Sequence, residues 1–245
     1  MKKIVLLFML PLLALMLFIA CRGDNDDKNN KVQLVKTITI YERVSWSLYF
    51  EYDEKDRVTS IFSDELDEKI TFIYSGDDFV KVLGFEGTKE CSKNGNTITI
   101  LDGKTTTILE LNSDEYPIKA KSSFEYYDHL GTTQIGEYHY NVQYLDGNLV
   151  YVSINDVKRC EYKYDNKKTP FYNCKTPKWF LIFYCLVTGP EFSGYYGVKN
   201  NVTEAKFGNP ERYDDTIERS YEYDANGFPT KIFCNGKLEA TFTYY

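Results

Sequence analysis

Two tyrosines and two carboxylates stand close together in YEYDANGFP, residues 221–229 near the end of the chain. A carboxylate beside phenol hydroxyls could act as a general acid or base in catalysis. The same stretch contains Asn-Gly, which is a strong signal for a tight turn between two strands. The two interpretations are therefore a piece of an active site and the turn of a β-hairpin.

Other catalytic residue types form no recognisable arrangement. His129 and His139 stand in neither a metal-ligand nor a catalytic-triad spacing. The acidic runs at 64–69 and 74–79 lack the spacing of a calcium-binding loop. Phosphate-binding glycine loops and the nucleophile elbow of hydrolases do not occur in the sequence. We expect no catalytic residue that can be named, no metal and no cofactor, although a carboxylate pair of the glycosidase kind stays open among 36 acidic residues.

Aromatic side chains are the other candidates, since the chain has 22 tyrosines and 16 phenylalanines. Exposed Tyr and Trp rings can stack on sugar rings, whereas the alternative is a cross-strand ladder that stabilises a sheet. FSGYYG, residues 192–197, puts three rings among small residues in an expected loop. Phe192, Tyr195 and Tyr196, together with Trp179, are therefore the candidate ligand-binding residues, and a glycan is the ligand class that they suit.

The elements that must position these residues are predicted to be strands, because apolar and polar residues alternate in many short runs. In EYHYNVQY, Tyr138 and Val142 fall on one face, while Glu137 and His139 fall on the other. This pattern is typical of a half-buried antiparallel strand. His139 is thus expected on an exposed, polar face.

A repeat connects the strands. Six apolar or aromatic positions are each followed, six residues later, by Val or Pro, with turn-forming residues between: Tyr52, Tyr74, Leu111, Tyr144, Tyr164 and Tyr223. Two strands alone are marginal in water, so such strand–turn–strand units must join into a larger sheet. We predict an all-β single domain over residues 37–245, a curved antiparallel sheet of repeated β-hairpins. YEYDANGFP is then architecture rather than active site.

One segment, TPKWFLIFYCLVTGPEF, interrupts the alternation. Thr176 and Pro177 suit the start of a helix, and residues 179–187 are continuously apolar. The run is too short to span a bilayer. We expect one short buried helical insertion, or alternatively a buried strand, with Trp179 and Phe180 covering one face of the sheet.

The N-terminus indicates export. Residues 1–20 have the layout of a signal peptide, with two lysines before an apolar run. Ala20 before Cys21 resembles the lipobox of bacterial lipoproteins, which implies a lipid on Cys21; an uncleaved membrane anchor is the alternative. Residues 21–36 form a polar tether, and its acidic start resembles the surface-export signal of Bacteroidetes lipoproteins. These resemblances imply a protein lipid-anchored to the outer membrane through Cys21 and exposed at the cell surface, with a periplasmic orientation left open.

Charge and cysteines narrow the partners and the chemistry. The formal net charge of −7 makes nucleic acid an unsuitable partner, because binding depends on Lys and Arg neutralising phosphates. Disulfides are permitted in an exported protein, but none of the cysteines beyond Cys21 has a C-x-x-C spacing, and their number is odd. Their pairing stays open, and buried free thiols are expected for most of them: Cys91, Cys160, Cys174, Cys185 and Cys234.

YKYDNKKTPFYN (162–173), KNNVTEA (199–205) and YEYDANGFPTKI (221–232) together resemble a family of uncharacterised Bacteroidetes lipoproteins, and the hairpins resemble the YD repeat of bacterial surface and toxin shells. The resemblance implies repeated hairpins and a lipid anchor, and it implies no known activity. We predict a non-enzymatic binding or structural module at the cell surface, with a glycan or a surface protein as partner. A carrier of lipids or other hydrophobes and a carboxylate-dependent glycan hydrolase are the alternatives.

Overall fold

The computed structural model describes residues 32–41, 44–65, 68–84, 87–127, 132–182, 198–209 and 212–245. Within it, Gln33–Tyr245 forms one compact unit. The expected signal peptide, Cys21 and most of the tether lie outside the described residues, as do Cys185 and residues 192–197. What was predicted for those residues stays a prediction.

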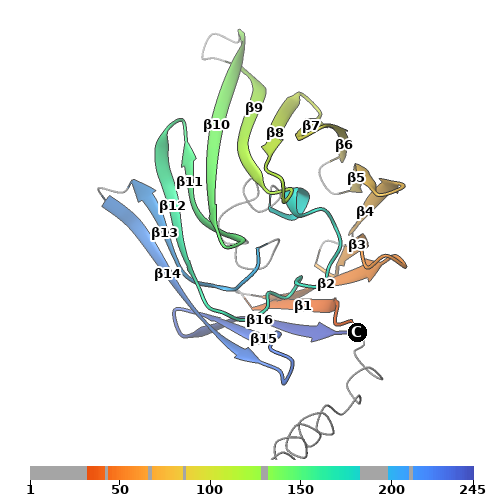
Figure 1. The fold of residues 1–245 in the computed structure, drawn as a ribbon, viewed down its shortest axis with the longest axis vertical. Coiled ribbons are helices and arrows are strands. Elements are labelled where there is room, and N and C mark those ends of the chain that lie inside the picture. Colours follow the sequence, from red (N-terminus) through yellow and green to blue (C-terminus); the bar gives the residue numbers. More distant parts are fainter. Residues whose placement is uncertain are drawn as a thin grey trace, which may run out of the picture. The chain divides into compact units, whose positions relative to one another are not determined.

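The described chain forms sixteen antiparallel strands that close into a barrel (Figure 1). Each strand pairs with the next along the chain, and β1 closes the ring by pairing with β16, for example through Ile38↔Phe242. The predicted antiparallel hairpins are confirmed, but the sheet is closed rather than merely curved, so each described strand has a neighbour on both sides. The strands are β1 (Val35–Tyr41), β2 (Ser45–Tyr52), β3 (Val58–Ser63), β4 (Glu68–Ser75), β5 (Asp78–Gly84), β6 (Gly87–Asn94), β7 (Thr97–Asp102), β8 (Thr105–Leu111), β9 (Pro117–Tyr127), β10 (Thr133–Leu145), β11 (Asn148–Ile154), β12 (Val157–Tyr164), β13 (Val202–Asn209), β14 (Arg212–Tyr223), β15 (Pro229–Cys234) and β16 (Lys237–Tyr244).

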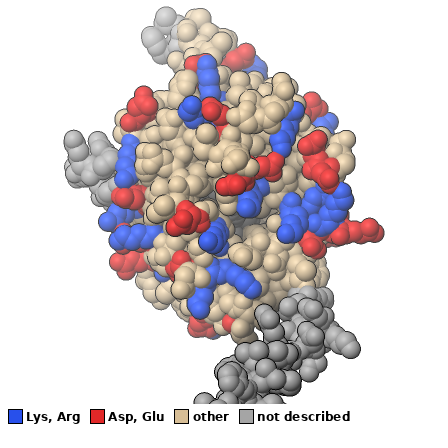
Figure 2. Space-filling view, in the orientation of Figure 1, with Lys and Arg blue, Asp and Glu red and all other residues tan. Residues whose placement is uncertain are grey.

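Alternation along the strands separates an apolar interior from a charged exterior. Phe72 and Val82 face each other across β4 and β5, and both are buried. The opposite face carries cross-strand ion pairs: Lys69–Glu51, Lys81–Glu90, Lys119–Glu110, Lys121–Glu137, Lys163–Glu204 and Lys231–Glu222. Figure 2 shows side chains of both signs interspersed over the visible face. The outer wall is mixed at these strands, since exposed Ile73, Leu83 and Ile108 lie among the ion pairs.

In three turns of the repeat, one side-chain oxygen accepts two backbone N–H groups of its own turn. In YEYDANGFP, Asp224 Oδ1 accepts the backbone N–H groups of Asn226 and Phe228, both at 2.9 Å. Asp53 and Asn112 accept the equivalent two bonds in their own turns. An oxygen that satisfies two backbone donors fixes the turn conformation. The stretch is therefore a hairpin turn, and its aspartate is occupied in holding the backbone.

The fifth unit of the repeat contains the insertion. Tyr164 pairs with Val202, so the sequence-based choice of Pro170 as the closing position was wrong. Asp165 Oδ1 still accepts one N–H from its own turn, but its second donor is the N–H of Asn201, at 3.1 Å. The intervening residues are thus inserted into a turn that closes in the same way as those of Asp53, Asn112 and Asp224. This explains the Asn-Asn element that precedes β13.

Four tyrosines connect strands at the end of the barrel where these turns lie; we call them the rim tyrosines. Each donates its hydroxyl to a backbone carbonyl at the start of a neighbouring strand: Tyr74 to Val58 at 2.8 Å, Tyr144 to Pro117 at 3.0 Å, Tyr164 to Leu149 at 2.6 Å and Tyr244 to Pro229 at 2.7 Å. Burial raises the pKa of Tyr74 to about 12 and also raises that of Tyr144. These phenols therefore stay protonated and act as structural donors rather than as nucleophiles.

The described part of the insertion packs inside the barrel. Residues 178–182 form a short helix, which confirms a helical element in this segment, although only a small one. The Phe180 ring lies 4.4 Å from the Phe79 ring, centroid to centroid, and the Trp179 ring lies 5.8 Å from it. Phe171 belongs to the same buried cluster. The apolar side chains of the insertion thus pack inside a closed wall instead of covering one face of an open sheet.

Candidate functional site

The β9–β10 hairpin reaches beyond the strands on either side of it. β8 pairs with β9 only as far as Ser123, and β11 pairs with β10 only from Tyr140 onward. The remaining stretch is held by the β9–β10 pairing alone, out to Thr133↔Tyr127. Figure 1 shows the two strands rising above their neighbours. Beyond those points neither β8 nor β11 flanks the hairpin.

Aromatic rings line that inner face, on the same side of the strands as buried Ala120 and Val142. We call them the aromatic row: Phe124, Tyr126, Tyr138 and Tyr140. The Phe124 and Tyr138 rings are stacked, with centroids 5.2 Å apart and planes 23° from parallel. The Tyr126 ring lies 6.1 Å from Phe124, and the Tyr140 ring lies 6.3 Å from Tyr138. Tyr126 and Tyr138 are 46% and 45% exposed, so a continuous aromatic surface is accessible.

Gly136 shapes this surface. It pairs with Phe124 across the two strands, and a Cβ atom built on it would lie 2.5 Å from Phe124 Cζ. The Phe124 ring therefore lies across the glycine, where it covers backbone that would otherwise meet water. Any side chain at position 136 would force the ring out of the row.

Polar groups border the row on the same wall. The Thr107 and Ser122 hydroxyls are buried and 2.8 Å apart, and Ser122 pairs with Tyr138 on the next strand. Thr105 is the next inward-facing residue of β8 beyond Thr107, further from the rim tyrosines, and it pairs with Asp102 on β7. Asp102 in turn pairs with Lys89 on β6, and their side chains form an ion pair. Rings, hydroxyls and one ion pair thus meet on a single inner surface.

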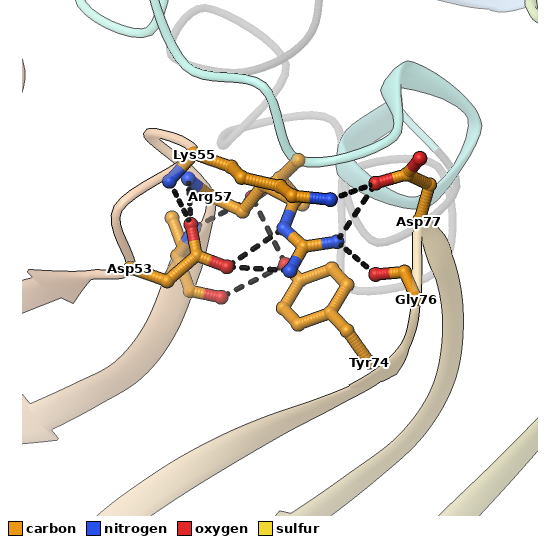
Figure 3. Close-up of polar contacts among 8 residues, drawn as sticks. Asp53, Lys55, Arg57, Tyr74, Gly76 and Asp77 are labelled. Atoms are coloured by element: carbon orange, nitrogen blue, oxygen red, sulfur yellow. Dashed lines mark hydrogen bonds and ion pairs between the residues drawn. The ribbon is translucent and has the colours of Figure 1, made fainter.

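A denser charged network, drawn in Figure 3, lies at the turn end of the barrel and is structural. Arg57 Nε donates to Asp53 Oδ2 at 2.7 Å, and Nη1 donates to the carbonyl of Gly76 at 2.7 Å (Figure 3). The guanidinium carbon lies 4.1 Å from the centroid of the Tyr74 ring. These partners belong to two successive turns of the repeat. The network therefore ties two hairpin tips together, and we assign it no catalytic role.

Two hollows lie near the insertion. A cleft of about 610 Å³ is bordered by side chains of both charges, including Glu115, Lys175 and Lys178. Leu181 and Val198 also line it, and these residues flank positions 183–197, which lie outside the described residues. An apolar cavity of about 40 Å³ lies deeper. We base no site on the cleft, because the described residues do not show what occupies it.

Of the predicted ligand-binding residues, the structure describes Trp179 alone. Trp179 is 3% exposed and lies in the core. Phe192, Tyr195 and Tyr196 lie outside the described residues. His139 is on the exposed face, as expected, with Nε2 3.5 Å from a carboxylate oxygen of Glu137.

The aromatic row was missed as a site, although the alternation already placed Tyr138 and Tyr140 on one face. The useful signal would have been Gly136 inside an otherwise regular strand pattern, since such a glycine marks a close approach by a neighbouring group.

The remaining chemistry-bearing residues do not form a second site. No group of three or more His, Cys, Asp or Glu in the described ranges could hold a metal ion. The cysteines that the structure describes, Cys91, Cys160, Cys174 and Cys234, are free thiols. Burial raises the pKa of Cys91 to about 12, which keeps that thiol protonated and unreactive. Within the described part of the chain, no helix is long and apolar enough to cross a membrane.

Comparison with known proteins gives similar folds but no family. No family model and no curated protein matches the chain. Among solved structures it is similar to a porin-like protein from Bacteroides uniformis, with 15% sequence identity and a TM-score of 0.38 over 86% of this chain and 98% of that one. A porin-like protein from Bacteroides vulgatus gives 15% identity and a TM-score of 0.38 over 87% and 99%. Neither likeness identifies what the chain does.

Proposed function

We propose that this protein is a non-enzymatic glycan-binding module, in which the aromatic row stacks against sugar rings. The main support for glycan binding is a set of four adjacent rings on the inner face of β9 and β10, of which Tyr126 and Tyr138 are close to half exposed. Sugar rings present apolar C–H faces, and aromatic rings with polar tips suit both those faces and the hydroxyls beside them. An accessible patch of inward-facing rings is also a typical mark of a binding surface.

The same rings stabilise the extension. Two strands held only by each other are marginal in water, and cross-strand aromatic pairs add to their stability. Packing alone would be served by rings that cover one another, whereas Tyr126 and Tyr138 keep accessible surface. Binding and stability therefore have to be measured separately in every variant of the row.

We place the module at the outer membrane, held by a lipid on Cys21. The Lys–Glu pairs on the outer wall support a barrel that stands in water beside the membrane. Metabolic labelling with a fatty acid tests the anchor. The label should disappear in Cys21→Ala, and a label that persists in that variant would refute lipidation at this cysteine.

The two alternatives have less support. A hydrophobe carrier is favoured by the apolar cavity, but about 40 Å³ holds only about three water-sized groups, so a lipid chain would have to displace a lining side chain such as Phe180. A glycan hydrolase needs two available carboxylates. Two carboxylates that point into the barrel each pair with a cation, Asp102 with Lys89 and Glu239 with Arg219.

A glycan array tests the proposal, using the full chain in a detergent without a sugar headgroup. The wild type should bind at least one neutral oligosaccharide. Tyr138→Ala should weaken that binding about tenfold, which corresponds to about 1.4 kcal/mol. Tyr49→Ala is the matched control, because Tyr49 is 42% exposed but lies on the outer face of β2, and it should bind like the wild type. Silence across the array, or equal losses in both variants, would contradict the proposal.

A further inference from the structure

We infer that Lys89 and Asp102 determine specificity: they recognise hydroxyl groups of a neutral glycan that lies on the aromatic row, and they disfavour acidic glycans. The inference rests on the proposed function, since the aromatic row must bind a sugar before Lys89 and Asp102 can form hydrogen bonds with it. It adds the class of glycan and the residues that select it.

The two charged side chains point into the barrel. Asp102 is two residues from buried Ile100, and Lys89 is two residues from buried Cys91, so each shares the inward face of its strand. The strand register puts Lys89 opposite Asp102, and Asp102 opposite Thr105 on β8. The pair therefore lies on the wall that continues into the aromatic row.

The register also gives the separation of the pair from the row. Thr106 pairs with Ser123, which brings Thr105 beside Phe124, and Phe124 pairs with Gly136. Asp102 is thus two strands away from Phe124. Neighbouring strands lie about 4.8 Å apart, so the two groups are separated by about 10 Å along the wall. An oligosaccharide stacked on Phe124 can reach that far.

Lys89 is less exposed than the lysines of the outer pairs, whereas the exposure of Asp102 lies within the range of the outer carboxylates. The side chains of Lys89 and Asp102 are 18% and 37% exposed, against 60% and 44% for Lys119 and Glu110 on the outer wall. Shielding from water strengthens a polar contact with a ligand. A partly buried ion pair contributes little to stability, because desolvation offsets the attraction. The stability of the fold therefore does not explain why Lys89 and Asp102 lie on the inner wall of the barrel.

The chemistry of the pair fits neighbouring hydroxyls. The Asp102 carboxylate can accept an O–H hydrogen bond, and the Lys89 ammonium can donate one to a hydroxyl oxygen. Hydrogen bonds to charged groups are stronger than those between neutral groups. The pair carries no net charge, so the attraction of Lys89 for a sugar carboxylate is offset by the repulsion from Asp102. An acidic sugar would therefore lose the hydration of its charge without a compensating attraction.

Calorimetric titration of the full chain tests this inference. The probes are neutral β-glucan, mannan and xylan oligosaccharides, and an oligogalacturonate. The wild type should prefer a neutral probe. Asp102→Asn and Lys89→Met should each weaken it about tenfold, the loss of one charge-assisted hydrogen bond. Glu110→Gln and Lys119→Met, which break an outer pair, should leave the affinity unchanged.

The outcomes separate the inference from the proposed function. If Tyr138→Ala loses the neutral probe while Asp102→Asn and Lys89→Met bind like the wild type, the inference is overturned and the proposed function stands. A preference for the oligogalacturonate also overturns the inference. If the wild type binds no probe, both fail. The exchanged pair, Lys89→Asp with Asp102→Lys, keeps the ion pair for folding, and weaker binding by a folded exchanged variant supports recognition.

Discussion

Replacing the rim tyrosines by phenylalanine removes four hydroxyls and keeps every ring. Each hydroxyl is the side-chain donor to a carbonyl at the start of a strand, at 2.6–3.0 Å. Losing one such hydrogen bond costs about 1 kcal/mol, and more where the carbonyl is left without water. Tyr74 and Tyr244 are far from the other sites, so their effects should add, whereas Tyr144 and Tyr164 both contact Leu149 and form a coupled pair. The variant with all four changes, Tyr74→Phe, Tyr144→Phe, Tyr164→Phe and Tyr244→Phe, should lose about 4 kcal/mol of unfolding free energy.

Urea denaturation measures this loss. The midpoint should fall stepwise with each substitution while the slope stays constant, because the surface exposed on unfolding does not change. Tyr49→Phe provides the control, since Tyr49 lies on the outer face, and its midpoint should match that of the wild type. A combined loss below about 1 kcal/mol, or a loss in the control equal to that of a rim variant, would refute the structural role of the rim tyrosines.

Three further predictions concern pH, the insertion and the site. Burial raises the pKa of Tyr74 to about 12, and also raises that of Tyr244, above the unfolded value of about 10. The free energy of unfolding should therefore stay constant below about pH 10 and fall as the pH rises towards about 12. Melting curves measured across this pH range, with phenolate absorbance as the readout of ionisation, check the prediction. A melting temperature that does not change with pH would contradict it. Asn201→Ala removes a side-chain donor to Asp165 and to the Lys168 carbonyl, at 3.2 and 2.9 Å. The free energy of unfolding in urea titrations should fall by about 2–4 kcal/mol. A loss under about 1 kcal/mol, as for an exposed residue, would contradict this role of Asn201. Gly136→Ala should lower glycan affinity by displacing the Phe124 ring, with about 1 kcal/mol of destabilisation; unchanged affinity would count against the row.

Much of the fold could be predicted from local pattern. Strand alternation depends on neighbouring residues alone, and so does the turn in which Asp224 accepts two backbone donors. Closure could not be predicted, because it depends on strand tilt and stagger and on the pairing of β1 with β16 across the whole chain. Pro170 was misassigned for a related reason: the residue that completes its turn, Asn201, is far away in the sequence.

The site depends even more on distant strands. Phe124 and Tyr138 lie on a stretch of β9 and β10 that β8 and β11 do not flank, and the sequence of β9 and β10 does not contain that information. Rings at regular strand positions therefore seemed to be ladder residues, while rings in a loop attracted the functional prediction. Trp179 was predicted both as a ligand-binding residue and as part of the cover of the sheet, and its burial agrees with the second prediction alone.

A crystal structure of the full chain with a bound neutral oligosaccharide tests the central claim most directly. We predict that a sugar ring lies against Phe124 and Tyr138, and that its hydroxyls approach Lys89 and Asp102. An oligosaccharide seated instead in the cleft beside Lys178, with the aromatic row empty, would contradict the claim.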